Sequence, residues 1–246
     1  MKTHFYLSAA LLLAAATLAS CDSKKKNDPT PPPPVYTYQV ASFADEWDSW
    51  AYTYNADGKV EQIDRNSGER VYNFAYSGNN VSVSGYATFT MVLGQNGYVA
   101  SMVDQWDDAR SFTYDAKGHM LTALKDTDLK STVTIADECI ASWTRYQSDA
   151  WQTKNHTFDS AKPNTGAIHN IYSEAAGVDR WLFESGLFGK PSAFMCSSSQ
   201  WTHSTTAATY SYEYDDNGCA TREIKAYGTD EPEIYTYTFN KITVSQ

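Results

Sequence analysis

The chain has 246 residues, of which 42% are hydrophobic, and it carries a formal net charge of −10. Its apolar content lies within the range of ordinary globular proteins. Residues 35–246 are more acidic than the whole chain, which argues against a surface that binds nucleic acid or an anionic membrane. Solubility is the simplest role for this charge.

Residues 1–20 have the pattern of a secretion signal. Lys2 precedes an apolar stretch from Phe5 to Leu18, which is too short to span a membrane but has the length of a signal-peptide core. The stretch ends in Leu18-Ala-Ser-Cys21. This ending resembles the lipobox of bacterial lipoproteins, whose cysteine is acylated and becomes the first mature residue. The resemblance implies a lipid anchor (palmitate) on Cys21 and a place in the cell envelope, at the outer membrane, facing either the periplasm or the surface; the alternative is an ordinary signal peptide with a chance cysteine.

The segment after Cys21 is predicted to be a tether. Residues 21–34 are rich in lysine and proline, cannot bury apolar area and favour the stiff polyproline II conformation. The remaining residues, 35–246, have the length of a single domain with a substantial core.

Glycines in polar turns recur with a period of about twenty residues. Gly58, Gly78, Gly97 and Gly118 are separated by 20, 19 and 21 residues, and each follows a run in which large apolar residues alternate with smaller or polar ones. This period equals one β-hairpin with two arms and two reversals. The sequence therefore predicts an all-β antiparallel up-and-down meander of about fourteen to eighteen strands. Curling into a barrel or a strongly bent sheet is expected, with closure favoured because it removes the free edges.

The alternation separates an aromatic face from a polar face. Tyr210, Tyr212 and Tyr214 alternate with Ser211, Glu213 and Asp215, and the same pattern holds near Trp50, Tyr72 and Tyr235. Half-buried strands have this pattern. A membrane-spanning barrel is the alternative, but such a barrel carries an apolar band outside, with aromatic girdles only at its two edges. In this chain the aromatic residues continue along the whole aromatic face of the strands, which disfavours a membrane-spanning barrel.

The alternation fades between Asp159 and Ser198. Within this stretch, residues 178–188 are apolar and predict one short helix, which Gly189-Lys-Pro191 would end. We expect this piece to plug the open end of the sheet, and a mobile lid over a pocket is the alternative.

Two family resemblances rest on these patterns. The segments 52–58, 112–118 and 212–218, in which an aromatic pair precedes Asp or Asn and then Gly, resemble tyrosine-aspartate (YD/RHS-type) repeats. The lipobox, the tether, the hairpin ladder and the stretch Gly186-Leu-Phe-Gly-Lys-Pro-Ser192 together resemble a Gram-negative lipoprotein family of unknown function. That resemblance implies a porin-like β fold and supplies no catalytic residues.

No motif for catalysis, cofactor binding or metal binding is present in the sequence. The histidines are scattered, and the Gly-x-Ser-x-Gly and phosphate-loop patterns are absent. Cys139, Cys196 and Cys219 lack the spacing of a zinc site. We expect them either to be small buried side chains or to include two that form a disulfide. We therefore predict a protein that is not an enzyme and has no cofactor; a hydrolase without a recognisable motif is the remote alternative.

Tryptophans flanked by carboxylates suggest a binding role. Trp47, Trp50 and Trp106 lie beside Asp and Glu residues, and aromatic faces with nearby carboxylates suit sugar rings. We predict a non-enzymatic binding module, with glycan as the ligand and these three residues as candidates. Packing in the core or at the rim is the competing role of the rings, and a structural scaffold for another envelope protein is the alternative function.

A modification site is also predicted. Asp159-Ser160-Ala161 resembles a three-residue acceptor pattern for O-glycans on exported proteins of some Gram-negative anaerobes, which makes Ser160 the candidate acceptor.

Overall fold

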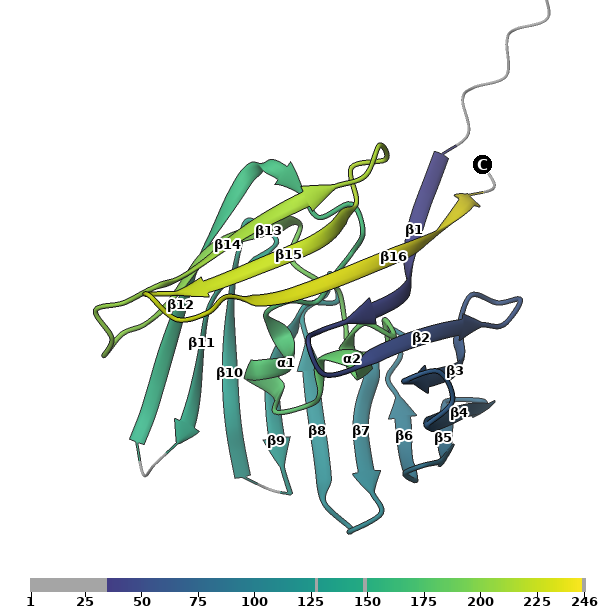
Figure 1. Ribbon diagram of the computed structural model, residues 1–246. Helices are drawn as coiled ribbons and strands as arrows, with labels where there is room; N and C mark the ends of the chain where they lie inside the picture. The colour runs from purple at the N-terminus through teal and green to yellow at the C-terminus, as the bar shows by residue number, and fades with distance from the viewer. Residues whose placement is uncertain (1–34, 127, 148–149, 245–246) are drawn as a thin grey trace, which may run out of the picture. The chain divides into compact units, whose positions relative to one another are not determined.

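The computed structural model describes residues 35–126, 128–147 and 150–244, so the predicted signal, the tether and Cys21 lie outside the described residues. The described residues form a closed barrel of sixteen antiparallel strands, in which each strand pairs with the next and β1 pairs with β16 (Figure 1). The strands are β1 Val35–Ala44, β2 Ser49–Tyr54, β3 Val60–Arg65, β4 Arg70–Ser77, β5 Asn80–Gly85, β6 Phe89–Leu93, β7 Val99–Asp104, β8 Ala109–Tyr114, β9 Met120–Lys125, β10 Asp128–Ala136, β11 Cys139–Gln147, β12 Ala150–Pro163, β13 Phe194–Trp201, β14 Ala208–Tyr214, β15 Ala220–Tyr227 and β16 Glu233–Val244. The predicted all-β meander is confirmed, and the barrel is closed.

Where a strand carries an alternating aromatic run, its rings point into the barrel. On β4, Tyr72 and Phe74 are buried while Asn73 and Ala75 are exposed. The outward positions of other strands carry small or polar exposed residues, including Thr53, Glu61, Ser82, Ser84, Thr132, Thr209, Glu213 and Thr238. Exposed apolar residues on this surface include Val92 and Val103 on β6 and β7 and the ring pair of Tyr146 and Trp151 on β11 and β12. The outer wall of the barrel is therefore polar, unlike the apolar band that a lipid-facing wall carries.

A recurring turn explains the predicted period. Asp115 Oδ1 accepts hydrogen bonds from the backbone N–H groups of Lys117 (2.9 Å) and His119 (2.8 Å), and Gly118 occupies a positive φ of 96°. The same side-chain bonds form at Asn55 and at Asp215. A short Asp or Asn side chain that bonds to the following backbone stabilises such a turn locally.

Inward tyrosines tie neighbouring strands together. Four of them donate a hydrogen bond across the sheet to the backbone carbonyl of an inward residue on the preceding strand: Tyr54 to Val40 (2.7 Å), Tyr76 to Val60 (2.9 Å), Tyr114 to Val99 (2.7 Å) and Tyr212 to Cys196 (2.8 Å). The aromatic repeats of the sequence therefore bury ring area and also satisfy carbonyl groups at the inner wall.

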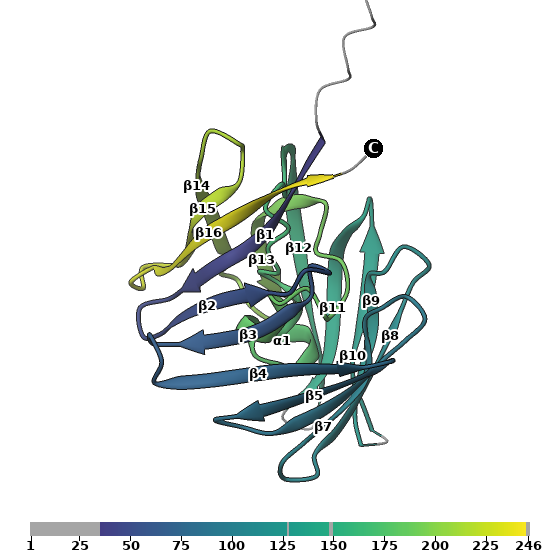
Figure 2. The ribbon, with the colours of Figure 1, turned by 90° about the vertical axis from the view of Figure 1, so that its right-hand side faces the viewer.

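The two ends of the barrel differ in the parts of the chain that they carry. Val35 on β1 pairs with Val244 on β16, so both lie at one end, here called the terminal mouth (Figure 2). Because hairpins of a meander alternate between the ends, the connections β1–β2, β3–β4 and so on to β15–β16 lie at the opposite end, here called the distal mouth.

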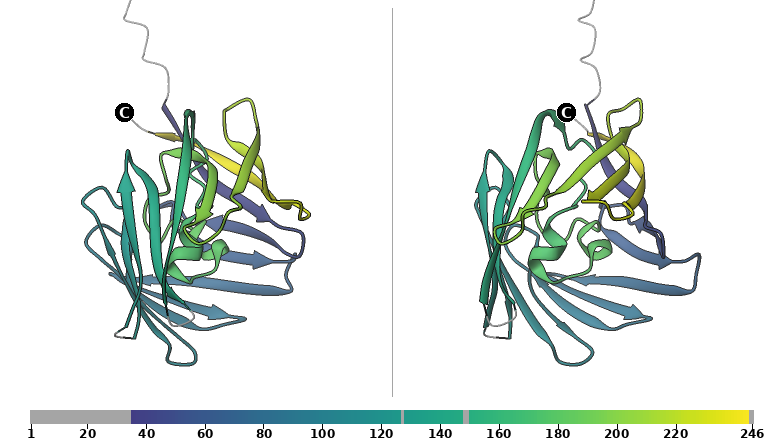
Figure 3. Two further views of the ribbon diagram at one scale, coloured as in Figure 1. Left: turned by 90° about the vertical axis from the view of Figure 1, so that its left-hand side faces the viewer. Right: turned by 60° about the vertical axis from the view of Figure 1, so that its left-hand side comes forward.

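The segment between β12 and β13, residues 164–193, fills the interior and is here called the plug. It contains the short helices α1 Tyr172–Ala176 and α2 Arg180–Phe183, which the strands enclose (Figure 3). The predicted short helix is present as α2, and α1 precedes it. Phe183 and Phe188 are fully buried, and Phe188 packs edge-on against Phe112 of β8 at 5.4 Å between ring centroids. The apolar plug residues thus complete a core that the inner wall alone would leave open.

Two further sequence predictions concern residues that the structure describes. Cys139, Cys196 and Cys219 are buried free thiols. Ser160 is exposed on β12, beside an irregularity in the pairing with β13, so its modification stays a prediction. Within the described residues, neither helix has the length and hydrophobicity of a membrane-spanning helix.

Candidate functional site

A cavity of about 470 Å³ opens at the distal mouth, between the plug and the strands β1–β3 and β14–β16. Its aromatic lining residues are Phe43, Trp50, Trp181, Tyr210 and Tyr235. Its carboxylate-bearing and cationic lining residues are Asp45, Asp48, Glu174, Asp179, Glu223, Arg65, Arg180 and Lys225. The volume falls within the range of small-molecule sites, and rings with interspersed polar groups are typical of such sites.

The aromatic side chains of this cavity hold one another in place. Phe43 stacks on Trp50 with 5.0 Å between ring centroids and on Tyr235 at 5.8 Å. The ring centroid of Trp181, on α2, lies 4.7 Å from that of Tyr72 on β4. The backbone carbonyl of Trp181 also accepts a hydrogen bond of 2.7 Å from Tyr52. Strands β1, β2 and β16 and the plug therefore present their rings on a rigid framework.

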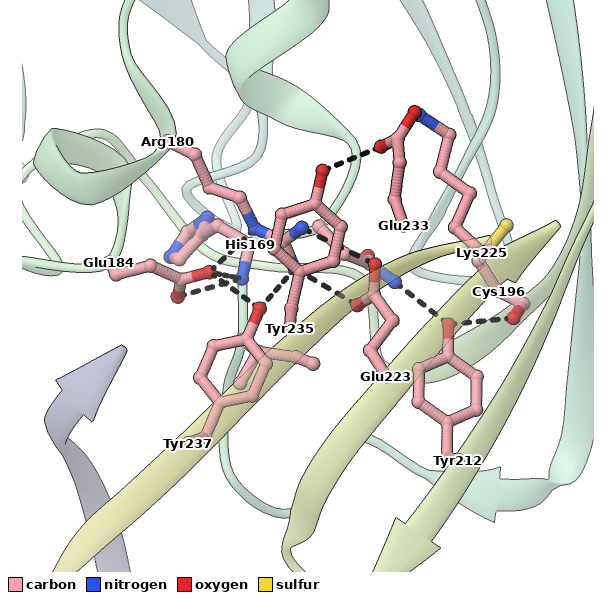
Figure 4. A network of polar contacts seen from close by, with 12 residues as sticks. His169, Arg180, Glu184, Cys196, Tyr212, Glu223, Lys225, Glu233, Tyr235 and Tyr237 are labelled. Carbon is pink, nitrogen blue, oxygen red and sulfur yellow. Dashed lines mark hydrogen bonds and ion pairs between the residues drawn. The ribbon is translucent and has the colours of Figure 1, made fainter. Parts of the chain in front are cut away.

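Arg180 lies at the floor of the cavity, where its charge is compensated (Figure 4). Its guanidinium donates to Glu223, with 2.9 Å between Nη2 and Oε2, and also contacts the hydroxyl of Tyr237. The guanidinium carbon lies 4.2 Å from the Tyr235 ring centroid. Burial disfavours the charged form, but attraction to Glu223, Tyr237 and Glu184 outweighs it, so the pKa of Arg180 is well above its usual value.

Glu184 and His169 lie behind Arg180, on the plug. Both carboxylate oxygens of Glu184 accept the backbone N–H of His169, at 3.0 and 3.1 Å, and Arg180 Nε lies 3.4 Å away. Burial raises the pKa of Glu184 to about 7, although Arg180 and the His169 N–H favour the carboxylate. Burial and the charge of Arg180 lower the pKa of His169 to about 3, so this imidazole is neutral near pH 7.

The rim of the cavity carries a second ion pair. Arg65 Nε donates to Asp48 Oδ1 at 2.7 Å, and Asn66 Nδ2 donates to the same oxygen at 2.9 Å. The hydrogen bond from Arg65 is the main reason that the pKa of Asp48 is lowered. The pair fixes the hairpin that places Trp50 and Asp45 at the mouth.

The three predicted tryptophans all lie toward the distal mouth, but not in one site. Trp50 is 7% exposed and lines the cavity, whereas Trp47 and Trp106 are 80% and 74% exposed on the β1–β2 and β7–β8 connections. Trp47 borders a hollow of about 230 Å³ that shares Asp45 and Tyr235 with the cavity, so it stands at the rim. Strands β3–β6 separate Trp106 from this rim.

Sequence reasoning missed the charged floor of the cavity. Arg180 and Glu184 interrupt the apolar stretch of the plug, and Glu223 occupies an inward position on β15, where it is fully buried. A buried charge needs a partner of opposite charge. Charged residues within an apolar or inward-facing run were therefore the sequence feature that could have indicated a buried ion pair. Arg180 and Glu184 are only four residues apart, but Glu223, the other partner of Arg180, lies 43 residues away and could not be identified from the sequence.

A second cavity, of about 340 Å³, opens at the terminal mouth between the plug, strands β1–β4 and β6, and the β6–β7 connection. Tyr54 and Tyr76 line it, but their hydroxyls are bonded to backbone carbonyls of neighbouring strands. Among the described residues, no group of three or more His, Cys, Asp or Glu side chains is arranged to hold a metal ion. The charged residues that line this second cavity are Lys59, Glu184 and Lys190, against eight in the distal cavity, which is therefore the stronger candidate for a ligand site.

The fold is similar to that of known structures. No protein-family model and no curated protein matches the chain. A structure described as a porin-like protein from Bacteroides uniformis ATCC 8492 superposes with a TM-score of 0.64, at 14% identity, over 82% of this chain and 96% of its own. Another, described as a porin-like protein from Bacteroides vulgatus ATCC 8482, gives 0.56 at 12% identity over 82% and 99%. At such identities the likeness confirms the predicted porin-like β fold and assigns no residue a role.

Proposed function

We propose that the chain is an acylated cell-envelope lipoprotein whose barrel binds a glycan, without catalysis, in the distal cavity. The observation that carries the proposal is the cavity itself, in which the half-buried rings of Trp181, Tyr210 and Tyr235, backed by the buried rings of Phe43 and Trp50, occur together with carboxylates and an amide. Sugar rings have apolar faces that pack on aromatic rings, and their hydroxyls need acceptors of the kind that the carboxylates provide.

The placement of the two mouths supports an envelope role. Val35, the first described residue and the point to which a tether would connect, lies at the terminal mouth, at the end opposite the distal cavity. The polar outer wall suits a barrel surrounded by water and held by its lipid, rather than a barrel that spans the bilayer. A single acyl chain anchors only marginally, and the two or three chains of a lipoprotein anchor stably.

Glycan binding is tested by calorimetric titration of the full chain, purified in detergent, with a panel of plant and host oligosaccharides. Trp181→Ala should weaken binding by at least about tenfold, because it removes one stacking surface. Trp106→Ala, on a separate hairpin, is the matched control and should bind as the wild type does. No heat of binding across the panel, from protein with an intact thermal transition, would refute the proposal.

The anchor is tested separately. Cys21→Ser should move the protein from the membrane fraction to the soluble fraction and remove the acyl mass from the mature chain. If the variant remains membrane-bound, the lipoprotein assignment is wrong, whatever the barrel binds.

A scaffold that holds another envelope protein is the second candidate. Six exposed aromatic side chains of the described residues lie on or beside connections at the distal mouth: Trp47, Tyr86, Trp106, Tyr146, Trp151 and Tyr227. Exposed aromatic side chains are enriched in protein interfaces. Recovery of one partner in stoichiometric amount from membranes, lost when Trp106 and Trp151 are both changed to Ala, would favour this candidate.

A further inference from the structure

The inner wall at the distal mouth carries a stripe of cations that the acidic composition conceals. The five cations belong to successive strands: Arg110, Lys125, Arg145 and Lys154 occupy inward positions on β8, β9, β11 and β12, and Lys130 lies at a pairing irregularity of β10. Each lies in the half of its strand that faces this mouth. Four of them line a hollow of about 140 Å³ that also contains Glu174. Glu174 lines the aromatic cavity as well, so the two spaces adjoin at α1.

Three of these cations are neutralised by the protein itself. Lys125 Nζ lies 2.6 Å from Asp108, Lys130 Nζ lies 3.4 Å from Asp128, and Lys154 Nζ lies 2.7 Å from Glu174. These three ion pairs are internal to the protein, so the two arginines are the members of the stripe whose charge is still to be accounted for.

Arg110 and Arg145 have no carboxylate within ion-pair distance among the described residues. Arg145 Nε is moreover buried without a hydrogen-bond partner in the described part of the chain, and its guanidinium carbon lies 5.1 Å from the rings of both Trp143 and Trp201. The Nε–H of this guanidinium is therefore held out of water with its hydrogen-bonding capacity unused, beside two aromatic rings. An anion that bonds to it would replace the missing partner, and a guanidinium can bind carboxylate or sulfate through two parallel hydrogen bonds.

We infer that the glycan is an acidic one, whose carboxylate or sulfate group binds Arg110 and Arg145 while a neighbouring sugar ring stacks in the aromatic cavity. The inference rests on the proposed glycan site and names its ligand class. An alternative role for the cations is to compensate the C-terminal carbonyls of α1, but no side chain of the stripe donates to those carbonyls within the described residues.

The test compares acidic glycans with their neutral counterparts on the full-length wild type. The probes are a hexamer of galacturonic acid with its methyl ester, and a carrageenan hexasaccharide, which carries sulfate but no carboxylate, with its desulfated form. We expect the acidic member of at least one pair to bind at least about tenfold more tightly, with binding that weakens as salt increases. The two pairs distinguish carboxylate from sulfate as the recognised group.

Arg110→Gln and Arg145→Gln should each abolish the acidic preference and leave the neutral member bound as before. Arg222→Gln makes the same charge change on an outward ion pair with Glu213 and should retain the preference. Equal binding of acidic and neutral members would overturn the inference while the glycan site stands. Binding of none of the four probes would overturn the inference for these anions, and an empty wider panel would refute the glycan site itself.

Discussion

Replacing Arg180 by Met tests whether the buried ion pair holds the plug in the barrel. Methionine keeps the length and the apolar contact with the rings of Phe43 and Tyr235 but removes the charge. Glu223, which is fully buried, then loses its cationic partner. Breaking a buried pair in this way costs about 3–5 kcal/mol, a large part of the free energy of unfolding of a typical domain, about 5–15 kcal/mol.

The assay is urea unfolding followed by tryptophan fluorescence and circular dichroism at pH 7.5. Arg180→Met combined with Glu223→Leu should recover at least about 2 kcal/mol relative to Arg180→Met alone, because the orphaned carboxylate is gone. Arg222→Met is the control, since it breaks an exposed pair with Glu213, at 2.5 Å, on the neighbouring outer wall and should cost less than about 1 kcal/mol. A cost for Arg180→Met as small as for Arg222→Met, or a double variant whose cost is the sum of the single costs, would refute the reasoning.

Further predictions concern a buried acid, a glycine and a tyrosine. The folded-state pKa of Glu184 is raised from 4.5 to about 7, so its protonation stabilises the fold below pH 4.5 and this contribution is lost as pH rises through 7. Glu184→Gln should remove about 3 kcal/mol of that pH dependence, and parallel unfolding curves of variant and wild type from pH 4.5 to 7.5 would contradict it. Gly85→Ala should cost more than about 3 kcal/mol in urea unfolding, because φ is +123° and a Cβ would lie 2.1 Å from a backbone carbonyl oxygen; Gly78→Ala, at φ +57° in open space, should cost only about 1 kcal/mol. Tyr114→Phe should cost about 1 kcal/mol by removing a cross-strand hydrogen bond, and exposed Tyr146→Phe should cost nearly nothing, so equal losses would show that the hydrogen bond is not responsible.

The strands and the hairpin turns could be predicted from the sequence alone. The rings at Tyr72 and Phe74 and the turn at Asp115–Gly118 act over a few residues, and the structure places them as predicted, inward and at a hairpin. Alternation with a period of two and polar turns are local properties, so they identify strands and hairpins without knowledge of the fold.

The position of the plug inside the barrel could not be predicted from local sequence patterns. The apolar stretch around Trp181 and Leu182 predicted a short helix near the correct position, but hydrophobicity alone does not say whether such a helix covers the end of a sheet or fills its interior. Its position depends on the closure of β1 on β16, because an open sheet has no lumen to fill. The enclosed plug is therefore a consequence of the tertiary structure.

By itself, the sequence determined the alternation, the turns and an acidic net charge, because these depend on neighbouring residues or on composition. Only the tertiary structure decided which charges meet. It brings Arg180 to Glu223, 43 residues away, and aligns Arg110 with Arg145 on one wall of a chain whose net charge is −10. Closure of the barrel determines which strands are neighbours. Because the interior excludes water, the interaction energy between the charges that meet there is larger than it would be in solvent.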